Sequence, residues 1–277
     1  MTRKRATLNE IRRFYAKLMT AASKSDDPRL ERIFDTVPRE AFMPPGPWQI
    51  VLDGSYFETP SADPVYLYQN ALVALDAAKG INNGEPFLHA AWIGLVAPKS
   101  GEVLCHVGAG SGYYTAILSL LVDPGGVVHA YEIDQHLASR ARENLAPYPA
   151  VAVTQGDATI LPMPPCDVIY VNAGVVAPPL LWLRALRAGG RMIFPWRPTE
   201  RAALAVLVTR RTDAFQVTPL MAAWFIPCIG ASSLEGCSKM PSVGEAQSAQ
   251  SIWLTSERSP DKTAVAVYKD LWFSSAP

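Results

Sequence analysis

Apolar and polar positions along the chain alternate in blocks that indicate strands and helices in turn. Residues 103–107 and 127–131 form short apolar runs, as expected of parallel strands that are buried on both faces. Between the two runs, residues 116–121 carry apolar side chains at helical spacing, and the sequence Asp-Pro-Gly-Gly at 123–126 ends that helix. The pattern predicts a unit of strand, helix and strand.

The same approach extends the prediction toward both ends of the chain. Helices are expected at 7–24, 26–37, 137–145 and 180–186, strands at 151–154, 167–173, 191–195, 203–209 and 215–217, and a β-hairpin between 251–255 and 263–268. We therefore predict an α/β fold with a Rossmann-like, doubly wound, mostly parallel sheet. Three parts are expected: a helical N-terminal extension (1–80), a central domain (81–230), and a C-terminal appendage of a loop and a β-hairpin (231–277).

Composition narrows the classes of protein that fit this pattern. Hydrophobic residues make up 49% of the 277 positions, so the chain can bury a large core. The 25 basic and 25 acidic residues balance, which gives no electrostatic case for a nucleic-acid partner. The four cysteines show no metal-ligand spacing, and no stretch has the pattern of a membrane span. We expect a cytoplasmic protein without a metal or a membrane partner, either a monomer or a homodimer.

A glycine cluster follows the first of the apolar runs. Glycines 108, 110 and 112 permit positive φ angles and let a ligand approach the bare backbone, next to the free N–H groups of a helix start. Glu132 stands twenty residues beyond Gly112, at the tip of the next strand, where a carboxylate can accept both hydroxyls of a ribose. These residues predict a nucleoside-containing cofactor.

The spacing of the glycines distinguishes between cofactors. Dinucleotide dehydrogenases require G-x-G-x-x-G, whereas here the third glycine comes one residue early and Tyr113 fills the usual position. This argues against a nicotinamide-linked oxidoreductase. The G-x-G-x-G pattern with an acidic strand end instead resembles the S-adenosylmethionine-dependent methyltransferases.

Several further motifs resemble one family of those enzymes. Val-Pro-Arg-Glu-Ala-Phe-Met-Pro at 37–44, Gly-Asp at 156–157, the run at 188–195 and the segment at 219–227 occur in the order and spacing of the protein-L-isoaspartate O-methyltransferases. The resemblance covers roughly residues 10–230. Members of this family transfer a methyl group from S-adenosylmethionine to the abnormal α-carboxylate of isoaspartyl residues in damaged proteins.

The resemblance implies a set of cofactor contacts. Glycines would cradle the methionine end, Glu132 would bind the ribose, and the step at 157–158 would contact the adenine. Where the family has an acidic residue near the methionine amine this chain has a histidine, which supplies no anion. The residues expected to bind the cofactor are His106, Gly108, Ala109, Gly110, Gly112, Glu132, Ile133, Asp157 and Ala158.

The segment at 80–90 corresponds to the family's "IGxGQTISxP" loop, which lies over the cofactor and receives the substrate carboxylate. Pro86 replaces the family's threonine and Leu88 its serine, so both hydroxyls are lost. Glu85 and His89 are candidate catalytic bases. The residues expected to contact the substrate are Asn82, Asn83, Leu88 and, at the tip of the fourth strand, Asn172.

A structural interpretation of the same segment stays open. Residues 82–84 would then form a tight turn, Glu85 would be a surface residue, and His89 would be a buried partner of backbone groups.

The sequence thus predicts a methyltransferase that acts on a carboxylate or another oxygen. The acceptor is either an isoaspartyl residue of a protein or a small molecule. In the alternative hypothesis, the chain is a small-molecule O- or N-methyltransferase that has lost the repair activity. A non-catalytic nucleoside-binding module is the third hypothesis.

Overall fold

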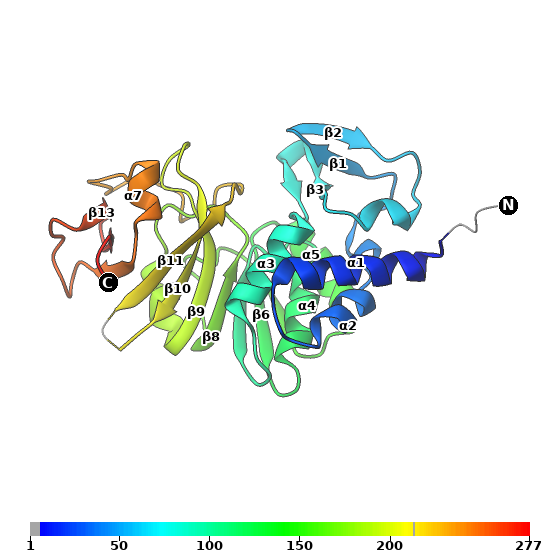
Figure 1. Ribbon diagram of the computed structural model, residues 1–277, viewed down its shortest axis with the longest axis horizontal. Helices are drawn as coiled ribbons and strands as arrows, with labels where there is room; N and C mark the ends of the chain where they lie inside the picture. Colours follow the sequence, from blue (N-terminus) through cyan, green and yellow to red (C-terminus); the bar gives the residue numbers. More distant parts are fainter. Residues whose placement is uncertain (1–5, 213) are drawn as a thin grey trace. The chain divides into compact units, whose positions relative to one another are not determined.

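The computed structural model describes residues 6–212 and 214–277. The chain forms two compact units (Figure 1), the first from residues up to 101 together with 109–154, the second from 102–108 together with 155–277. The glycine cluster thus contains a crossing point between the units, since Gly108 belongs to the second and Ala109 to the first.

The first unit is mainly helical and carries a small antiparallel sheet with the strand order β2-β1-β3-β4. Strands β6 and β7 also belong to this unit and are neighbours. Its elements are α1 (Leu8–Ser23), α2 (Leu30–Thr36), the 3₁₀ turns η1 (Arg39–Phe42), η2 (Pro64–Leu67) and η3 (Ala77–Lys79), β1 (Gln49–Leu52), β2 (Ser55–Glu58), β3 (Leu72–Asp76), β4 (Ile81–Asn82), α3 (Pro86–Val96), α4 (Tyr113–Val122), β6 (Val127–Glu132), α5 (Gln135–Asn144) and β7 (Val151–Gln155).

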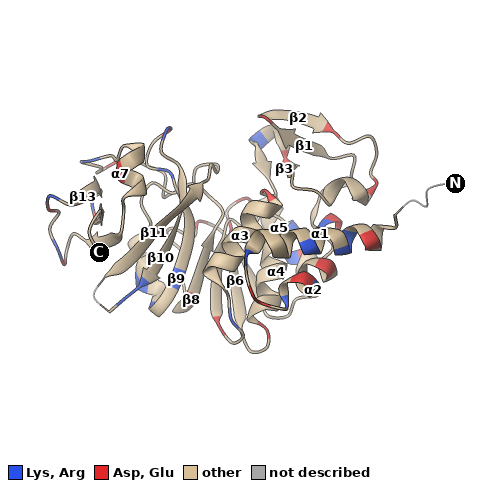
Figure 2. Cartoon of the chain, in the orientation of Figure 1, with Lys and Arg blue, Asp and Glu red and all other residues tan. Residues whose placement is uncertain are grey.

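The predicted first helix is present, and the sequence explains both of its ends. Thr7 and Glu10 form a capping box, in which the Thr7 hydroxyl accepts from the Glu10 N–H at 3.3 Å and the Glu10 carboxylate accepts from the Thr7 N–H at 2.7 Å. Lys24 ends the helix in the left-handed conformation. The buried stripe of α1 includes Tyr15 and Met19, while charges of both signs follow its outer surface (Figure 2).

The second helix is shorter than predicted, because its start at Asp26 is wrong. The Asp27 carboxylate accepts from the backbone N–H and the guanidinium of Arg29, at 2.9 and 3.0 Å. This local turn competes with helix formation, so α2 begins only at Leu30.

The second unit is a sheet with the strand order β13-β14-β12-β11-β10-β9-β8-β5. Strands β5, β8 and β9 pair in parallel, as the α/β prediction requires, and the pairs beyond β9 are antiparallel. Its elements are β5 (Val103–Val107), β8 (Cys166–Val171), α6 (Leu180–Ala185), β9 (Leu186–Trp196), β10 (Leu204–Arg210), β11 (Phe215–Ala222), α7 (Val243–Gln247), β12 (Ser251–Leu254), β13 (Ala264–Val267) and β14 (Leu271–Ser274).

The C-terminal strands correct one detail of the prediction. A hairpin between 251–255 and 263–268 was expected, but β12 and β13 do not pair directly. Strand β14 lies between them and pairs antiparallel with both. The Phe273 ring stacks on Trp196 of β9 with 4.0 Å between ring centroids, so the C-terminal segment packs into the core of this unit.

Membrane-spanning helices and metal-ligand clusters are both absent from the described ranges, 6–212 and 214–277. None of the helices there combines the length and hydrophobicity that crossing a bilayer needs. Histidine, cysteine, aspartate and glutamate side chains nowhere gather there in a group of three that could hold a metal ion.

Candidate active site

The glycine turn of the first unit is shaped by positive φ angles and close packing. Gly110 has φ +57° and Gly112 has φ +97°. A β-carbon at position 112 would lie 2.7 Å from a methyl carbon of Leu145, so both the backbone and the space require glycine there. Gly112 is the N-cap of α4 and gives the helix no side-chain cap. The turn therefore presents an uncapped helix start, as predicted.

Glu132 lies at the end of β6 and is bound to this turn. One carboxylate oxygen accepts from the Gly110 N–H at 2.7 Å, and the other accepts from the Asp134 N–H at 3.0 Å. The side chain is buried, and this burial raises the pKa of Glu132 against the lowering effect of the backbone N–H groups of Asp134, Gly110 and Ile133. A carboxylate has about four lone-pair sites, so it can accept from a hydroxyl donor as well. Its neighbour Ile133 is 39% exposed.

The segment at 80–90 adopts the predicted tight turn. The Asn82 side chain accepts from the Gly84 N–H at 2.9 Å. The Asn83 backbone N–H donates to the Val73 carbonyl at 2.8 Å, and the buried Asn83 side-chain nitrogen has no hydrogen-bond partner within the described residues. This segment thus holds one buried amide that is not satisfied.

The two candidate bases lie in different environments. Glu85 is exposed and precedes α3, and its carboxylate accepts from the side-chain amide of Asn70. His89 is 1% exposed and stacks on Tyr114 with 3.8 Å between ring centroids. A β-carbon at Gly84 would lie 2.2 Å from Nε2 of His89, so the backbone of the turn lies directly against the imidazole. Leu88 is half-buried on the same helix.

In the second unit, His106 and Asn172 lie side by side near Gly108. The Asn172 side-chain nitrogen is 2.8 Å from Nε2 of His106, and a β-carbon at Gly108 would contact the Asn172 side chain at 3.4 Å. Burial lowers the pKa of His106 from its ordinary 6.5 to about 3. The imidazole is therefore neutral at physiological pH and supplies neither a cation nor an anion.

The predicted adenine step is held by several contacts within the second unit. The Asp157 carboxylate accepts from the Thr159 N–H at 2.8 Å, and the Ala158 carbonyl accepts from the Trp182 indole at 2.8 Å. Gly230 has φ +84°, and a β-carbon there would lie 2.2 Å from the Thr159 hydroxyl and 2.8 Å from the Asp157 carboxylate. The segment around Gly230 therefore packs directly on this step.

Two residues that contact these segments were not predicted from the sequence. They are Asn70, which binds Glu85, and Gly230, which packs against Asp157. A helix whose first residues are Glu-Pro has no side-chain cap of its own and signals that a cap must come from elsewhere in the chain. A glycine three residues after the Ile-Pro step of 226–227 signals a close backbone approach.

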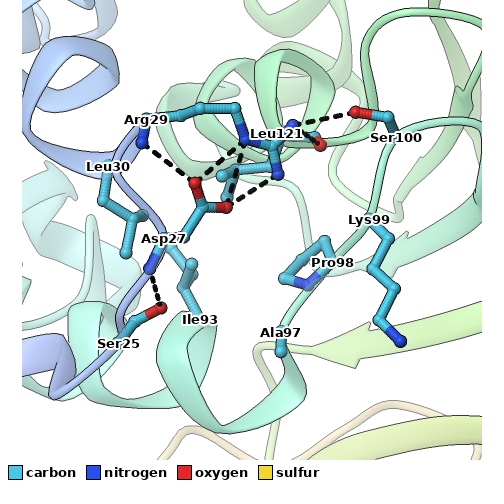
Figure 3. A pocket seen from close by; sticks show the side chains of 10 residues that line it. All are labelled: Ser25, Asp27, Arg29, Leu30, Ile93, Ala97, Pro98, Lys99, Ser100 and Leu121. Carbon is cyan, nitrogen blue, oxygen red and sulfur yellow. Dashed lines mark hydrogen bonds and ion pairs between the residues drawn. The ribbon is translucent and has the colours of Figure 1, made fainter.

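A pocket of about 190 Å³ lies in the first unit and contains none of the predicted site residues. Figure 3 shows that Asp27 and Arg29 face each other across hydrogen bonds in this pocket. The Arg29 guanidinium also donates to the Ser100 hydroxyl and the Leu121 carbonyl, both at 2.9 Å. The polar groups of Asp27, Arg29 and Ser100 in this pocket therefore bind one another.

Comparison with known proteins connects this chain to one family. The family model described as Protein-L-isoaspartate(D-aspartate) O-methyltransferase (PCMT) matches residues 18–233. A protein-L-isoaspartate O-methyltransferase of Ignicoccus hospitalis is 28% identical over 197 residues, which cover 70% of this chain and 85% of the relative. A protein-L-isoaspartate O-methyltransferase 2 of Pelobacter propionicus is 29% identical over 211 residues, with 74% and 84% covered.

Solved structures agree on the fold. A protein-L-isoaspartate O-methyltransferase superposes with a TM-score of 0.67 at 24% identity, covering 80% of this chain and 66% of that chain. A putative protein-L-isoaspartate O-methyltransferase from Plasmodium falciparum, in complex with S-adenosyl-L-homocysteine, superposes with a TM-score of 0.62 at 16% identity, covering 78% and 97%. The predicted Rossmann-like fold is confirmed. Since the family model spans most of the sequence, the chain belongs to the protein-L-isoaspartate O-methyltransferase family.

Proposed function

We propose that this protein transfers a methyl group from S-adenosylmethionine to the α-carboxylate of isoaspartyl residues in proteins. Membership of the family makes the chain an S-adenosylmethionine-dependent methyltransferase, as the sequence predicted. The observation that carries the substrate assignment is the match over residues 18–233, which includes the loop at 80–90 as well as the cofactor motifs. The alternative, a small-molecule acceptor, rests on the loss of the two loop hydroxyls at Pro86 and Leu88, and the family match gives it no support.

The residues of the first unit fit the cofactor. Positive φ angles at Gly110 and Gly112 would let the methionine part lie against the backbone, and the neighbouring Ala109 adds no bulk beyond one methyl. The Glu132 carboxylate is fixed in direction by two N–H groups and would accept the ribose hydroxyls with its remaining lone pairs. Ile133 would pack beside the nucleoside.

Within the second unit, the family resemblance assigns Asp157 and Ala158 to the adenine, on a step that Trp182 and Gly230 hold in place. His106, Gly108 and Asn172 would lie at the methionine end. Because burial keeps the imidazole neutral, this end would be bound through hydrogen bonds rather than through an ion pair.

When bound, S-adenosylmethionine supplies an electrophilic methyl group on a charged sulfonium. An isoaspartyl carboxylate is already ionised at neutral pH and needs no base, so the task of the protein is to align the reacting groups and to exclude water. The loop lacks the two family hydroxyls, and the side-chain nitrogen of Asn83, which has no hydrogen-bond partner among the described residues, is itself buried. Glu85 and His89 would then shape the loop rather than remove a proton.

The test is transfer of labelled methyl from S-adenosylmethionine to an isoaspartyl peptide, scored as methanol released by mild alkali. The control is a peptide of the same sequence with ordinary aspartate. Binding of S-adenosylhomocysteine is measured by calorimetry on the same preparation. We expect release from the isoaspartyl peptide alone. Tight binding without release from either peptide would contradict the proposed acceptor and direct the search to small acids, phenols and amines.

A further inference from the structure

We propose that Asn70 is a positioning residue for the substrate loop. It caps the amino-terminal end of α3 from a distant point in the first unit and so fixes residues 82–88. This inference rests on the proposed function only for the identity of the substrate. The contacts themselves belong to the fold.

Helix α3 lacks a cap of its own. Its N-cap residue, Glu85, makes no side-chain hydrogen bond to the helix start, and Pro86 at the first helical position has no N–H group. The first backbone donor that requires a partner is therefore the N–H of Phe87. It donates to the side-chain oxygen of Asn70 at 2.8 Å, across seventeen residues of sequence.

The other end of the same amide is also bound. The Asn70 side-chain nitrogen donates to the Glu85 carboxylate. A carboxylate only accepts and a backbone N–H only donates, so the two partners allow a single orientation of the amide. Asn70 thus joins the two residues that flank Pro86, one through its oxygen and one through its nitrogen.

Asn70 itself lies on a turn whose backbone carbonyls accept hydrogen bonds from a buried guanidinium. Arg39 is fully buried, and its guanidinium donates to the carbonyls of Gln69 at 3.1 Å and of Ala71 at 2.8 Å, as well as to that of Leu67. These carbonyls lie on either side of Asn70. Because charged hydrogen bonds in the interior are strong, the turn has little freedom to move.

A chain of contacts therefore runs from Arg39 through the turn and Asn70 to the start of α3. The residues that α3 positions include Gly84, whose backbone lies against His89, and the tight turn formed by Asn82. Loss of the Asn70 cap would let the first turn of α3 fray, and the substrate loop would lose its fixed geometry. Cofactor binding would not change, because Asn70 contacts none of the residues assigned to the cofactor.

The first test is kinetic. Asn70→Ala should raise KM for an isoaspartyl peptide about tenfold, in line with the loss of a helix cap, while the Kd for S-adenosylhomocysteine stays within about twofold of the parent value. Gln69→Ala is the matched control, since its exposed side chain only donates to the Tyr66 carbonyl. It should leave both constants unchanged.

A double substitution makes the test specific. Asn70→Asp keeps an acceptor for the Phe87 N–H but removes the donor to Glu85 and places two carboxylates together, so it should raise KM as well. Adding Glu85→Gln restores a donor and acceptor pair with the roles exchanged, and should return KM to within about threefold of the parent value. Failure of the double variant to recover, with its fold intact, would overturn the proposal.

A readout independent of activity separates this inference from the proposed function. Hydrogen exchange of the Phe87 amide should accelerate in Asn70→Ala, remain slow in Gln69→Ala, and slow again in the double variant. If the parent protein transfers no methyl to isoaspartyl peptides but the exchange rates behave this way, the substrate assignment fails and the cap stands. Equal exchange rates of the Phe87 amide in Asn70→Ala and Gln69→Ala would contradict the proposed cap.

Discussion

The role of a single residue in this protein depends on the hydrogen-bond partners of its polar atoms. Glu132 uses one lone pair of each carboxylate oxygen on the backbone N–H groups of Gly110 and Asp134. The same carboxylate therefore ties the strand tip to the glycine turn and keeps the capacity to accept further hydrogen bonds. A sequence motif predicts the residue type at this position, but only the structure gives its partners.

A neutral substitution at this carboxylate should weaken cofactor binding. Glu132→Gln places an amide nitrogen where a backbone N–H already donates, and hydrogen bonds to a charged group contribute about 1.5–3 kcal/mol. We expect the Kd for S-adenosylhomocysteine to rise roughly 10- to 100-fold in calorimetry. Glu143→Gln, at an exposed position of α5, is the control. An unchanged Kd in Glu132→Gln would contradict the proposal that Glu132 binds the ribose.

Gly230 should be required for cofactor binding, because its positive φ angle and its close packing both favour glycine. Gly230→Ala adds a methyl group against Thr159 and Asp157 at a φ of +84°. Overpacking of this kind costs about 1–3 kcal/mol, so cofactor affinity should fall on the order of tenfold. Gly236→Ala, also at positive φ but beside Lys269, is the matched control. Equal losses in the two variants would mean that Gly230 acts on the fold and not on the adenine step.

The buried His106 makes stability depend on pH. Its pKa falls from 6.5 to about 3 on folding, so between these values the unfolded chain binds more protons than the folded one. Its contribution is fully present above pH 6.5 and is lost as the pH falls toward 3. The slope is up to about 1.4 kcal/mol per pH unit.

Denaturant unfolding of the parent and of His106→Asn between pH 7 and pH 5 measures this contribution. The parent should lose stability more steeply than the variant as the pH falls. Parallel curves would show that His106 is not buried as a neutral group.

At the scale of elements, sequence patterns predicted an element best where all the residues that determine it lie within one stretch of the chain. The first helix was predicted closely because its cap and its apolar stripe lie within one stretch. The second helix and the C-terminal hairpin were predicted incorrectly in their bounds or pairing. Asp27 makes a local turn with Arg29, and β14 inserts between β12 and β13. In the first case a local side-chain turn replaced the first turn of the helix, and in the second case a strand outside the predicted hairpin decided the pairing.

The C-terminal strands should stabilise the second unit through their aromatic residues. Phe273 is fully buried and stacks on Trp196, so Phe273→Ala should reduce the free energy of unfolding by about 3–5 kcal/mol in urea. Trp224→Ala, at a residue that is 62% exposed, should change it by less than about 0.5 kcal/mol. A loss below about 1 kcal/mol in Phe273→Ala would mean that this segment is only loosely attached.

At the scale of the whole molecule, the family match covers only part of the chain. The match ends at residue 233, while helix α7 and strands β12, β13 and β14 follow it. The resemblance could therefore predict the fold class and the cofactor motifs, which depend on glycines and one carboxylate at fixed spacing. It could not predict the cap by Asn70, because that contact joins a residue of an irregular turn to a helix seventeen positions away.

We propose that the altered loop still presents an isoaspartyl carboxylate for methylation. The measurement that tests it most directly is tandem mass spectrometry of an isoaspartyl peptide after incubation with the protein and S-adenosylmethionine. We predict that the added methyl group resides on the α-carboxylate of the isoaspartyl residue, and that the peptide with ordinary aspartate stays unmodified. A methyl group on any other atom, or on both peptides alike, would contradict the account.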